Sequence, residues 1–412
     1  MAAVTGSRYN SAVRVFPLLL AAVCLPALAA GQTTSGAAPA DRAQLPHWLQ
    51  DTFVDVHVGG VSYPFSRLQL ETGSTVSSIR RPAPIVRVTL NGRHLSERVS
   101  LQLSYMRPVQ YVRYDDLNGT TRDRTVWMHY AMLTLKALLP VGRRLSLYGE
   151  AGPALATRSG FNLDGEPVVR DMMAATAVLG VGLDLQLTPR WAVTAGATYL
   201  PGKRSVRQPR TVVASAGVRY SLRALTDERV RQVRDAGRMF PRTLAHVELT
   251  GGTGYSVNNF FSRKVPVFWG GNVKVDQGLA AHVERSVFHT RSVFSLGFGA
   301  SLGAWKTRRD DQRFATLSVY PVLRFTVVRT RPFDLYLTYS MAGPTFISRV
   351  AMDGHQTGPR FTFQDFMGLG AFLGRDRRTH IGIKINHYSN GNLFPSNAGV
   401  KIPLTLVVGR TF

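Results

Sequence analysis

Apolar and polar residues alternate along most of this chain in segments of about ten residues, separated by stretches rich in Gly, Pro, Asn and Asp. The clearest segment is residues 333–341, where apolar side chains occupy the odd positions and mainly polar side chains the even ones. A period of two places alternate side chains on opposite faces of a β-strand. The pattern therefore predicts an all-β protein.

Sixteen strands are predicted, in two sets of eight. The first set covers residues 52–65, 83–91, 97–112, 125–139, 144–157, 171–187, 191–200 and 210–222. The second set covers residues 243–257, 267–285, 292–306, 313–329, 332–346, 361–374, 379–389 and 399–412. Between the sets, residues 226–241 are densely charged and lose the alternation, which predicts a linker or a short surface helix at a domain boundary.

The connections between the predicted strands alternate in length. Tight turns are predicted at residues 91–94, 140–143, 188–190, 329–332 and 374–378, and longer connections at 66–82, 113–124, 158–170, 201–209, 347–360 and 390–398. Short turns on one rim and long loops on the other are typical of a transmembrane barrel. A periplasmic β-sandwich also alternates, but its Greek-key connections do not require this rhythm. We therefore predict two tandem eight-stranded antiparallel up-and-down outer-membrane β-barrels, with one sixteen-stranded barrel as the alternative.

The N-terminus predicts export. Residues 1–30 carry Arg8 and Arg14, then an apolar run that ends in the small-residue pattern of Ala27 and Ala29, which indicates a secretory signal peptide. Residues 31–50 are expected to be a disordered lead-in, followed by barrels over residues 51–225 and 242–412. The one cysteine, Cys24, lies in the signal peptide, so disulfide and thiol chemistry are excluded from the mature chain. The predicted location is a Gram-negative outer membrane.

The formal net charge is +25, from 50 Lys and Arg against 25 Asp and Glu. Such a balance is compatible with nucleic acid, but the export signal argues against that partner. The phosphates of a surface glycolipid, or a polar barrel interior, account for the charge as well.

Residues 381–389 contain the candidate chemistry. Ile381, Ile383 and Ile385 share one strand face, and the same parity places His387 and Ser389 on it. The two polar residues are separated by roughly 7 Å at Cα, at ~3.3 Å rise per residue, a gap that rotamers can close to a hydrogen bond. In an even-stranded barrel with periplasmic termini, the seventh strand runs outward. A base and a nucleophile then face lipid at the level of the lipopolysaccharide leaflet.

The run His387-Tyr-Ser-Asn-Gly-Asn-Leu, followed by Asn397-Ala-Gly-Val, resembles the signature of the PagL-type lipid A 3-O-deacylases (the acyloxyacyl hydrolase family), over residues 242–412. The resemblance implies an eight-stranded outer-membrane barrel that hydrolyses the ester at position 3 of lipid A without a cofactor or a metal. It assigns Ser389 as nucleophile, His387 as general base, and Asn390 and Asn397 to the oxyanion site. Lipopolysaccharide (lipid A) and outer-membrane lipid are the implied partners, and the aromatic C-terminus suits the outer-membrane assembly machinery.

One position departs from the family. The family carries an acidic residue just after the Asn-x-Gly element, where this chain has Lys401, and a lysine cannot accept the imidazole N–H. Asp365 and Glu248, the latter with His246 in a barrel lumen, are the alternative acceptors. The remaining histidines lack metal-ligand spacing and are expected to be structural or solvated.

Two functional classes therefore remain. The first is a lipid A esterase, with a phospholipase as a variant of it. The second is a non-enzymatic tandem barrel for adhesion, transport or structure, with a degenerate site. The N-terminal half resembles OmpA/OmpW-like barrels generically and offers no catalytic constellation.

Overall fold

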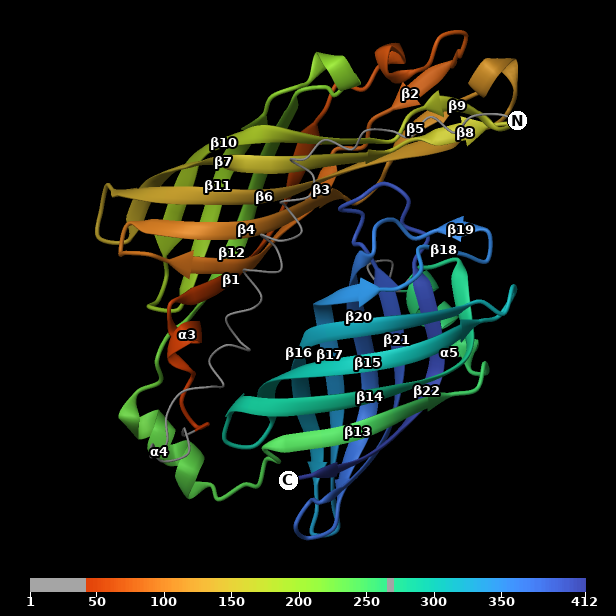
Figure 1. Ribbon diagram of the computed structural model, residues 1–412. Coiled ribbons are helices and arrows are strands. Elements are labelled where there is room, and N and C mark those ends of the chain that lie inside the picture. Colours follow the sequence, from red (N-terminus) through yellow and green to blue (C-terminus); the bar gives the residue numbers. More distant parts are fainter. Residues whose placement is uncertain (1–41, 265–269) are drawn as a thin grey trace. The chain divides into compact units, whose positions relative to one another are not determined.

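A computed structural model of the protein describes residues 42–264 and 270–412. The chain forms two compact units, each built around one closed antiparallel barrel (Figure 1). One unit contains Leu45–Leu225 with Asn392–Ser396, and the other contains Thr226–Gly391 with Asn397–Phe412 and the described residues 42–44. The predicted signal peptide, residues 1–30, and residues 31–41 of the lead-in lie outside the described residues. Residues 42–50 of that lead-in include a short helix, α3 (His47–Gln50).

The N-terminal barrel consists of eight strands joined in a ring. They are β1 (Thr52–Ser62), β3 (Pro84–His94), β4 (Val99–Pro108), β6 (Arg124–Pro140), β7 (Leu145–Ser159), β10 (Met172–Gln186), β11 (Trp191–Leu200) and β12 (Thr211–Leu222). The ring runs β6-β4-β3-β1-β12-β11-β10-β7, and pairing of β7 with β6 closes it. The predicted turn at 91–94 is wrong, because β3 continues to His94 after a bulge between Thr89 and Asn91. The turn follows instead, with the Leu95 N–H donating to the Val99 carbonyl.

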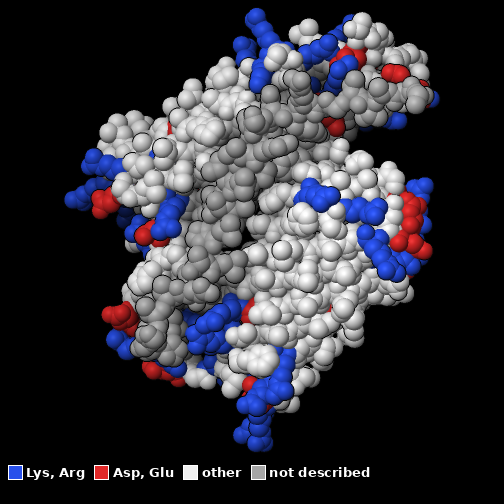
Figure 2. All heavy atoms as spheres, in the orientation of Figure 1, with Lys and Arg blue, Asp and Glu red and all other residues white. Residues whose placement is uncertain are grey.

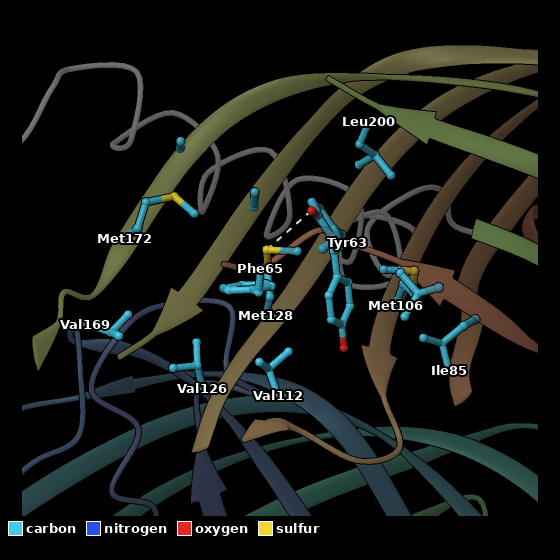
Figure 3. Close-up of a cluster of buried hydrophobic side chains, with 14 of the residues drawn as sticks. Tyr63, Phe65, Ile85, Met106, Val112, Val126, Met128, Val169, Met172 and Leu200 are labelled. Atoms are coloured by element: carbon cyan, nitrogen blue, oxygen red, sulfur yellow. Dashed lines mark hydrogen bonds between the residues drawn. The ribbon is translucent and has the colours of Figure 1, made fainter. Parts of the chain in front are cut away.

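The long connections of this barrel carry short elements of their own that the sequence pattern did not predict. They are β2 (Ser78–Arg80), β5 (Val112–Asp115), β8 (Phe161–Leu163) and β9 (Glu166–Val169), with 3-10 turns at Arg67–Gln69, Leu117–Gly119 and Arg204–Val206. Tyr63 and Phe65, from the connection after β1, pack with Ile85, Met106 and Met128 into a buried apolar core (Figure 3). The connection after β1 is therefore held to the wall strands by hydrophobic burial.

The C-terminal barrel also has eight strands. They are β13 (Thr243–Thr250), β14 (Val273–His289), β15 (Phe294–Thr307), β16 (Arg313–Arg329), β17 (Phe333–Ile347), β20 (Phe361–Leu373), β21 (Thr379–Ser389) and β22 (Val400–Thr411). They pair in chain order, and β13 pairs with β22 to close the ring. A small hairpin of β18 (Ala351–Met352) and β19 (His355–Gln356) lies in one long connection.

The first strand of this barrel is shorter than predicted. β13 ends at Thr250 rather than at residue 257, and β14 begins at Val273 rather than at 267, because a helix, α5 (Tyr255–Lys264), intervenes. Gly252 and Gly254 have φ of +72° and +80°, a left-handed backbone that ends the strand. Beyond Thr250, β14 and β22 meet directly in a short parallel bridge.

Both rings are closed, so the sixteen-stranded and sandwich alternatives are wrong. A closed ladder leaves no edge strand at which the two barrels could merge into one sheet. In sequence the barrels are joined by a stretch containing α4 (Asp227–Asp235), a helix within the predicted linker. The Thr226 hydroxyl caps α4 by accepting a hydrogen bond from the Arg229 N–H.

The outer walls are apolar and the lumens are polar. Outward-facing Val283 and Leu302 are 57% and 63% exposed, whereas their inward neighbours are buried. The face formed by β13–β15 is largely free of charged atoms, which gather toward the strand ends (Figure 2). Inside the barrels, charged side chains are paired, for example Arg87 with Glu150 at 3.0 Å. Among the described residues, no helix is long and apolar enough to cross a membrane.

Candidate active site

His387 lies on the outer face of the C-terminal barrel, as the strand parity predicts. Its neighbours Asn386 and Tyr388 face inward, because the Asn386 amide donates to Glu248 at 3.0 Å and the Tyr388 hydroxyl lies 3.2 Å from the Thr316 hydroxyl, inside the barrel. Ser389 shares the face of His387 and is half-buried. Towards the middle of the wall, Ile381 and Ile383 on the same face are each 43% exposed.

His387 is itself buried, with 5% of its side-chain surface exposed. Its Nε2 lies 2.9 Å from the carbonyl oxygen of Gly270, and its Nδ1 lies 3.5 Å from Oδ2 of Asp365. A carbonyl only accepts, so Nε2 carries the proton in this arrangement. The hydrogen bond between His387 and Ser389 that the sequence suggested is absent from the described interactions. The Gly270 carbonyl is instead the hydrogen-bond partner of Nε2.

Asp365 is the carboxylate that the fold brings to His387. The two residues are direct partners across the β20–β21 ladder, which places their side chains on one face. The Ala342 N–H donates to Oδ1 of Asp365 at 2.7 Å. That N–H is available because β17 bulges between Ser340 and Gly343, where Ala342 adopts a φ of +56°. Glu248, the other acceptor considered from sequence, is fully buried in the lumen on the opposite side of the wall.

Asn390 and Asn397 form hydrogen bonds that stabilise the connection following β21. The Asn390 N–H donates to Oδ1 of Asn397 at 3.0 Å, and Nδ2 of Asn390 donates to the Thr357 carbonyl at 3.1 Å. Asn390 is fully buried, whereas Asn397 is partly exposed. The contact of Asn397 with Asn390, which directly follows Ser389, therefore ties the two ends of this connection together.

Lys401 occupies the other side of His387. It is the direct partner of His387 across the β21–β22 ladder and is 8% exposed. Lys274, which the sequence reading did not single out, is in turn the partner of Lys401 in the parallel bridge between β14 and β22. Four strands thus present a row of directly paired residues on the outer face, in the order Asp365, His387, Lys401, Lys274.

Helix α5 packs beside this row. The Tyr255 hydroxyl donates to the carbonyls of Val275 and Lys401, the latter at 3.3 Å, and Nδ2 of Asn258 donates to the Ile402 carbonyl at 2.9 Å. The β21–β22 ladder is irregular between Lys384 and Asn386, which leaves these β22 carbonyls to the helix. The alternation predicts a strand over residues 243–257, and Gly252 and Gly254 are the residues of that stretch that indicate the break.

A second cluster of titratable residues lies inside the same barrel. Glu248 accepts contacts from His282 at 2.9 Å, from His246 at 3.5 Å and from the Lys384 ammonium. The two histidines are direct partners across β13 and β14, although 36 positions separate their numbers 246 and 282. Two imidazoles and a carboxylate with this spacing can hold a metal ion. Here the Lys384 ammonium is the cation beside the carboxylate.

Comparison with protein families gives a match within the C-terminal barrel. The family model described as "Lipid A 3-O-deacylase (PagL)" matches residues 269–403, which include His387, Ser389 and Asn397. No curated protein matches the chain. The match supports a lipid A deacylase-like outer-membrane enzyme.

Solved structures similar to the chain are outer-membrane barrels. The crystal structure of the outer membrane enzyme PagL is 15% identical and covers 41% of this chain and 99% of its own, with a TM-score of 0.29. The N-terminal barrel domain of Pseudomonas aeruginosa OprF is 18% identical and covers 42% of this chain and 97% of its own, with a TM-score of 0.28. Neisserial surface protein A is also 18% identical and covers 42% of this chain and 97% of its own, with a TM-score of 0.28.

Proposed function

We propose that the C-terminal barrel is an outer-membrane esterase that hydrolyses an acyl ester of lipid A, with Ser389 as nucleophile, His387 as general base and Asp365 as the group that orients the base. The observation that carries the proposal is the placement of His387 and Ser389 together on the apolar outer wall, with a carboxylate 3.5 Å from Nδ1 of the imidazole. A soluble substrate would not require the site to face the membrane.

Catalysis requires the imidazole to exchange its partner. His387 Nε2 leaves the Gly270 carbonyl and the ring changes tautomer: Nε2 gives its proton to solvent, and Nδ1 takes a proton from solvent and points it at Asp365. Nε2 then accepts the proton of the Ser389 hydroxyl as Oγ attacks the ester carbonyl carbon. The tetrahedral intermediate collapses, the C–O bond to the sugar breaks, and the imidazolium returns the proton to the departing sugar oxygen. Water then attacks the acyl-serine by the same route and releases the fatty acid.

Asp365 supplies the negative charge that an imidazolium needs. Fixed by the Ala342 N–H, its carboxylate faces Nδ1 and favours the tautomer in which Nε2 is the basic nitrogen. Lys401 on the other flank cannot play this part, since an ammonium only donates. In this chain the acid therefore comes from β20 rather than from β22.

The oxyanion requires fixed donors, each worth about 3–4 kcal/mol in the transition state. Asn390 donates through its backbone N–H to Oδ1 of Asn397, and through Nδ2 to the Thr357 carbonyl in the connection between β19 and β20. Oδ1 of Asn397 accepts the backbone N–H of Asn390, and this contact orients the Asn397 side-chain amide. We assign the oxyanion role to Asn397 first and regard Asn390 as the residue that positions it.

The apolar outer wall also supports a location in the outer membrane. Strands of 11 to 17 residues in the C-terminal barrel, apart from the short β13, reach or exceed the ~9–11 residues that a membrane strand needs. The predicted signal peptide would direct the chain to that membrane, and the lipid A leaflet would then contact the end of the barrel that carries Ser389.

The test is mass spectrometry of lipid A from a Gram-negative host that produces the protein. Loss of one acyl chain with wild-type protein, absent with Ser389→Ala and retained with Ser292→Ala, is the expected result. Ser292 is the matched control because it is exposed in the short turn between β14 and β15. Heat-modifiable migration on gels should verify that each variant is folded in the membrane.

A second candidate is a barrel that binds lipid without cleaving it. Two features favour this alternative. Lys401 stands beside His387 at the position where the family has an acid, and the Gly270 carbonyl contacts Nε2, the nitrogen that would have to act as the base. Unchanged lipid A in a host with correctly inserted wild-type protein would reject the esterase.

A further inference from the structure

Two cations on the rim of long connections converge on one aromatic ring. Nζ of Lys274, at the start of β14, lies 5.7 Å from the centre of the Tyr255 ring, and Cζ of Arg308, after β15, lies 5.9 Å from the same centre. The Arg308 N–H also donates to the Lys274 carbonyl at 2.8 Å, so the two backbones are held together. The three residues come from α5, β14 and the connection after β15, which are far apart in sequence.

Neither cation has a carboxylate within ion-pairing distance among residues 42–264 and 270–412. Neighbouring cations on the same rim do: Lys306 pairs with Asp311 at 2.9 Å and Arg309 with Asp310 at 3.6 Å. Asp353, the buried acid of this rim, accepts from the Thr307 hydroxyl and from the N–H groups of Arg309 and Asp310. Two exposed like charges beside one ring repel each other unless an anion lies between them.

The cations adjoin the candidate active site. Lys274 pairs with Lys401 across the β14–β22 bridge, and Lys401 pairs with His387. Tyr255, which both cations approach, also donates to the Lys401 carbonyl. An anion held by Lys274 and Arg308 would therefore lie two strands from the imidazole, on the same outer face.

We propose that Lys274, Arg308 and Tyr255 form a binding site for a phosphate group on the headgroup of the lipid whose ester is cut. The proposal rests on the proposed esterase function and names the part of the substrate that this rim recognises. A phosphate monoester suits the site because its oxygens can accept charge-assisted hydrogen bonds from an ammonium and a guanidinium together. The Tyr255 ring lies near both charged groups, 5.7 Å from Nζ of Lys274 and 5.9 Å from Cζ of Arg308. Such a contact would fix the position of the sugar relative to Ser389.

The test is binding to the full chain carrying Ser389→Ala, purified and folded in detergent. Its ligands are bisphosphorylated lipid A and the same lipid A with its phosphates removed. Lys274→Gln with Arg308→Gln should weaken binding of the phosphorylated lipid about tenfold, in line with the loss of charge-assisted contacts, and should leave binding of the dephosphorylated lipid unchanged. The matched control is Lys306→Gln with Arg313→Gln, which removes the same charge from the same rim and should change neither affinity more than about twofold.

Each outcome decides a separate question. Equal losses in the two double variants, or an equal loss for both lipids, would overturn the site. Protection of the wild-type fold by inorganic phosphate, without any preference for the phosphorylated lipid, would also overturn it and indicate a site for free phosphate. Phosphate-dependent binding by a wild-type protein that leaves lipid A uncut would reject the esterase and keep the site. Cleavage whose rate depends neither on the lipid phosphates nor on Lys274 and Arg308 would keep the esterase and reject the phosphate site.

Discussion

Asp365 and His387 face each other across adjacent strands of the C-terminal barrel, with the carboxylate Oδ2 3.5 Å from the imidazole Nδ1. The pairing is set by the β20–β21 register, and the Ala342 N–H fixes the carboxylate from its other side. In the proposed site, Asp365 takes the part of the acid that the family resemblance leads us to expect after the Asn-x-Gly element, and it lies on the opposite flank of the histidine.

Asp365→Asn is expected to lower kcat by about 10²–10⁴, because removal of the orienting acid leaves the histidine in the wrong tautomer more often. Binding of the lipid should be unaffected, since the residue touches the base and not the headgroup. The measurement is the initial rate of acyl release at saturating lipid, with a separate binding titration. Asp310→Asn, on the exposed loop, is the control and should keep the wild-type rate. A loss under about threefold for Asp365→Asn would reject the assignment.

Lys401→Glu should rescue Asp365→Asn. The two positions flank His387 on β22 and β20, so a carboxylate at 401 is within reach of the same imidazole. The double variant is expected to recover about tenfold in rate over Asp365→Asn, a change of about 1.4 kcal/mol in the barrier. The rate of acyl release is again the readout, and no recovery would mean that the orientation of His387 does not depend on a flanking acid.

Glu248→Leu should destabilise the C-terminal barrel by about 3–5 kcal/mol, because it leaves the buried Lys384 ammonium without its partner. Replacing both, as Glu248→Leu with Lys384→Met, should recover most of that loss, since an apolar pair carries no desolvation penalty. Urea titration in detergent, with protease-protected fragments of the C-terminal barrel as the signal, measures the free energy of unfolding. A double variant no more stable than the single one would show that the histidines, rather than the ion pair, organise the lumen.

A pH-sensitive contact is predicted on the N-terminal barrel, outside the membrane strands. Hydrogen bonds from Arg80, then from Ser78 and Arg113, hold the pKa of the Asp115 carboxyl well below its usual range. Because the folded-state pKa is depressed, the stabilisation is present above the unfolded-state pKa of about 3.9 and is lost as pH falls below it.

Hydrogen exchange of residues 77–81, corrected for its intrinsic pH dependence, should therefore show protection at neutral pH that declines below about pH 4. Asp115→Asn should show weak protection at every pH. Unchanged protection in acid would mean that the β2–β5 ladder, rather than the carboxylate, holds this segment.

The sequence by itself determined the walls of both barrels. A period of two is a local property, so each of the sixteen wall strands was recognisable, most ends lay within a few residues, and the outward face of His387 and Ser389 followed from parity. Turn positions were also local in most cases. The turn at 91–94 failed because a bulge at Thr89 and Asn91 carries β3 further than the pattern suggests.

Only the tertiary structure decided which side chains lie beside His387 and which lie inside the barrel. Sequence reasoning left Asp365 and Glu248 as equal acceptors, and the barrel wall separates them: one lies outside at His387 and the other inside with Lys384. Sequence reasoning also did not predict helix α5, the pairing of Lys274 with Lys401 or the pairing of His246 with His282. The physical reason is register, because cross-strand neighbours are set by long-range hydrogen-bonded ladders and bulges, and the spacing of residues along one strand carries no record of them.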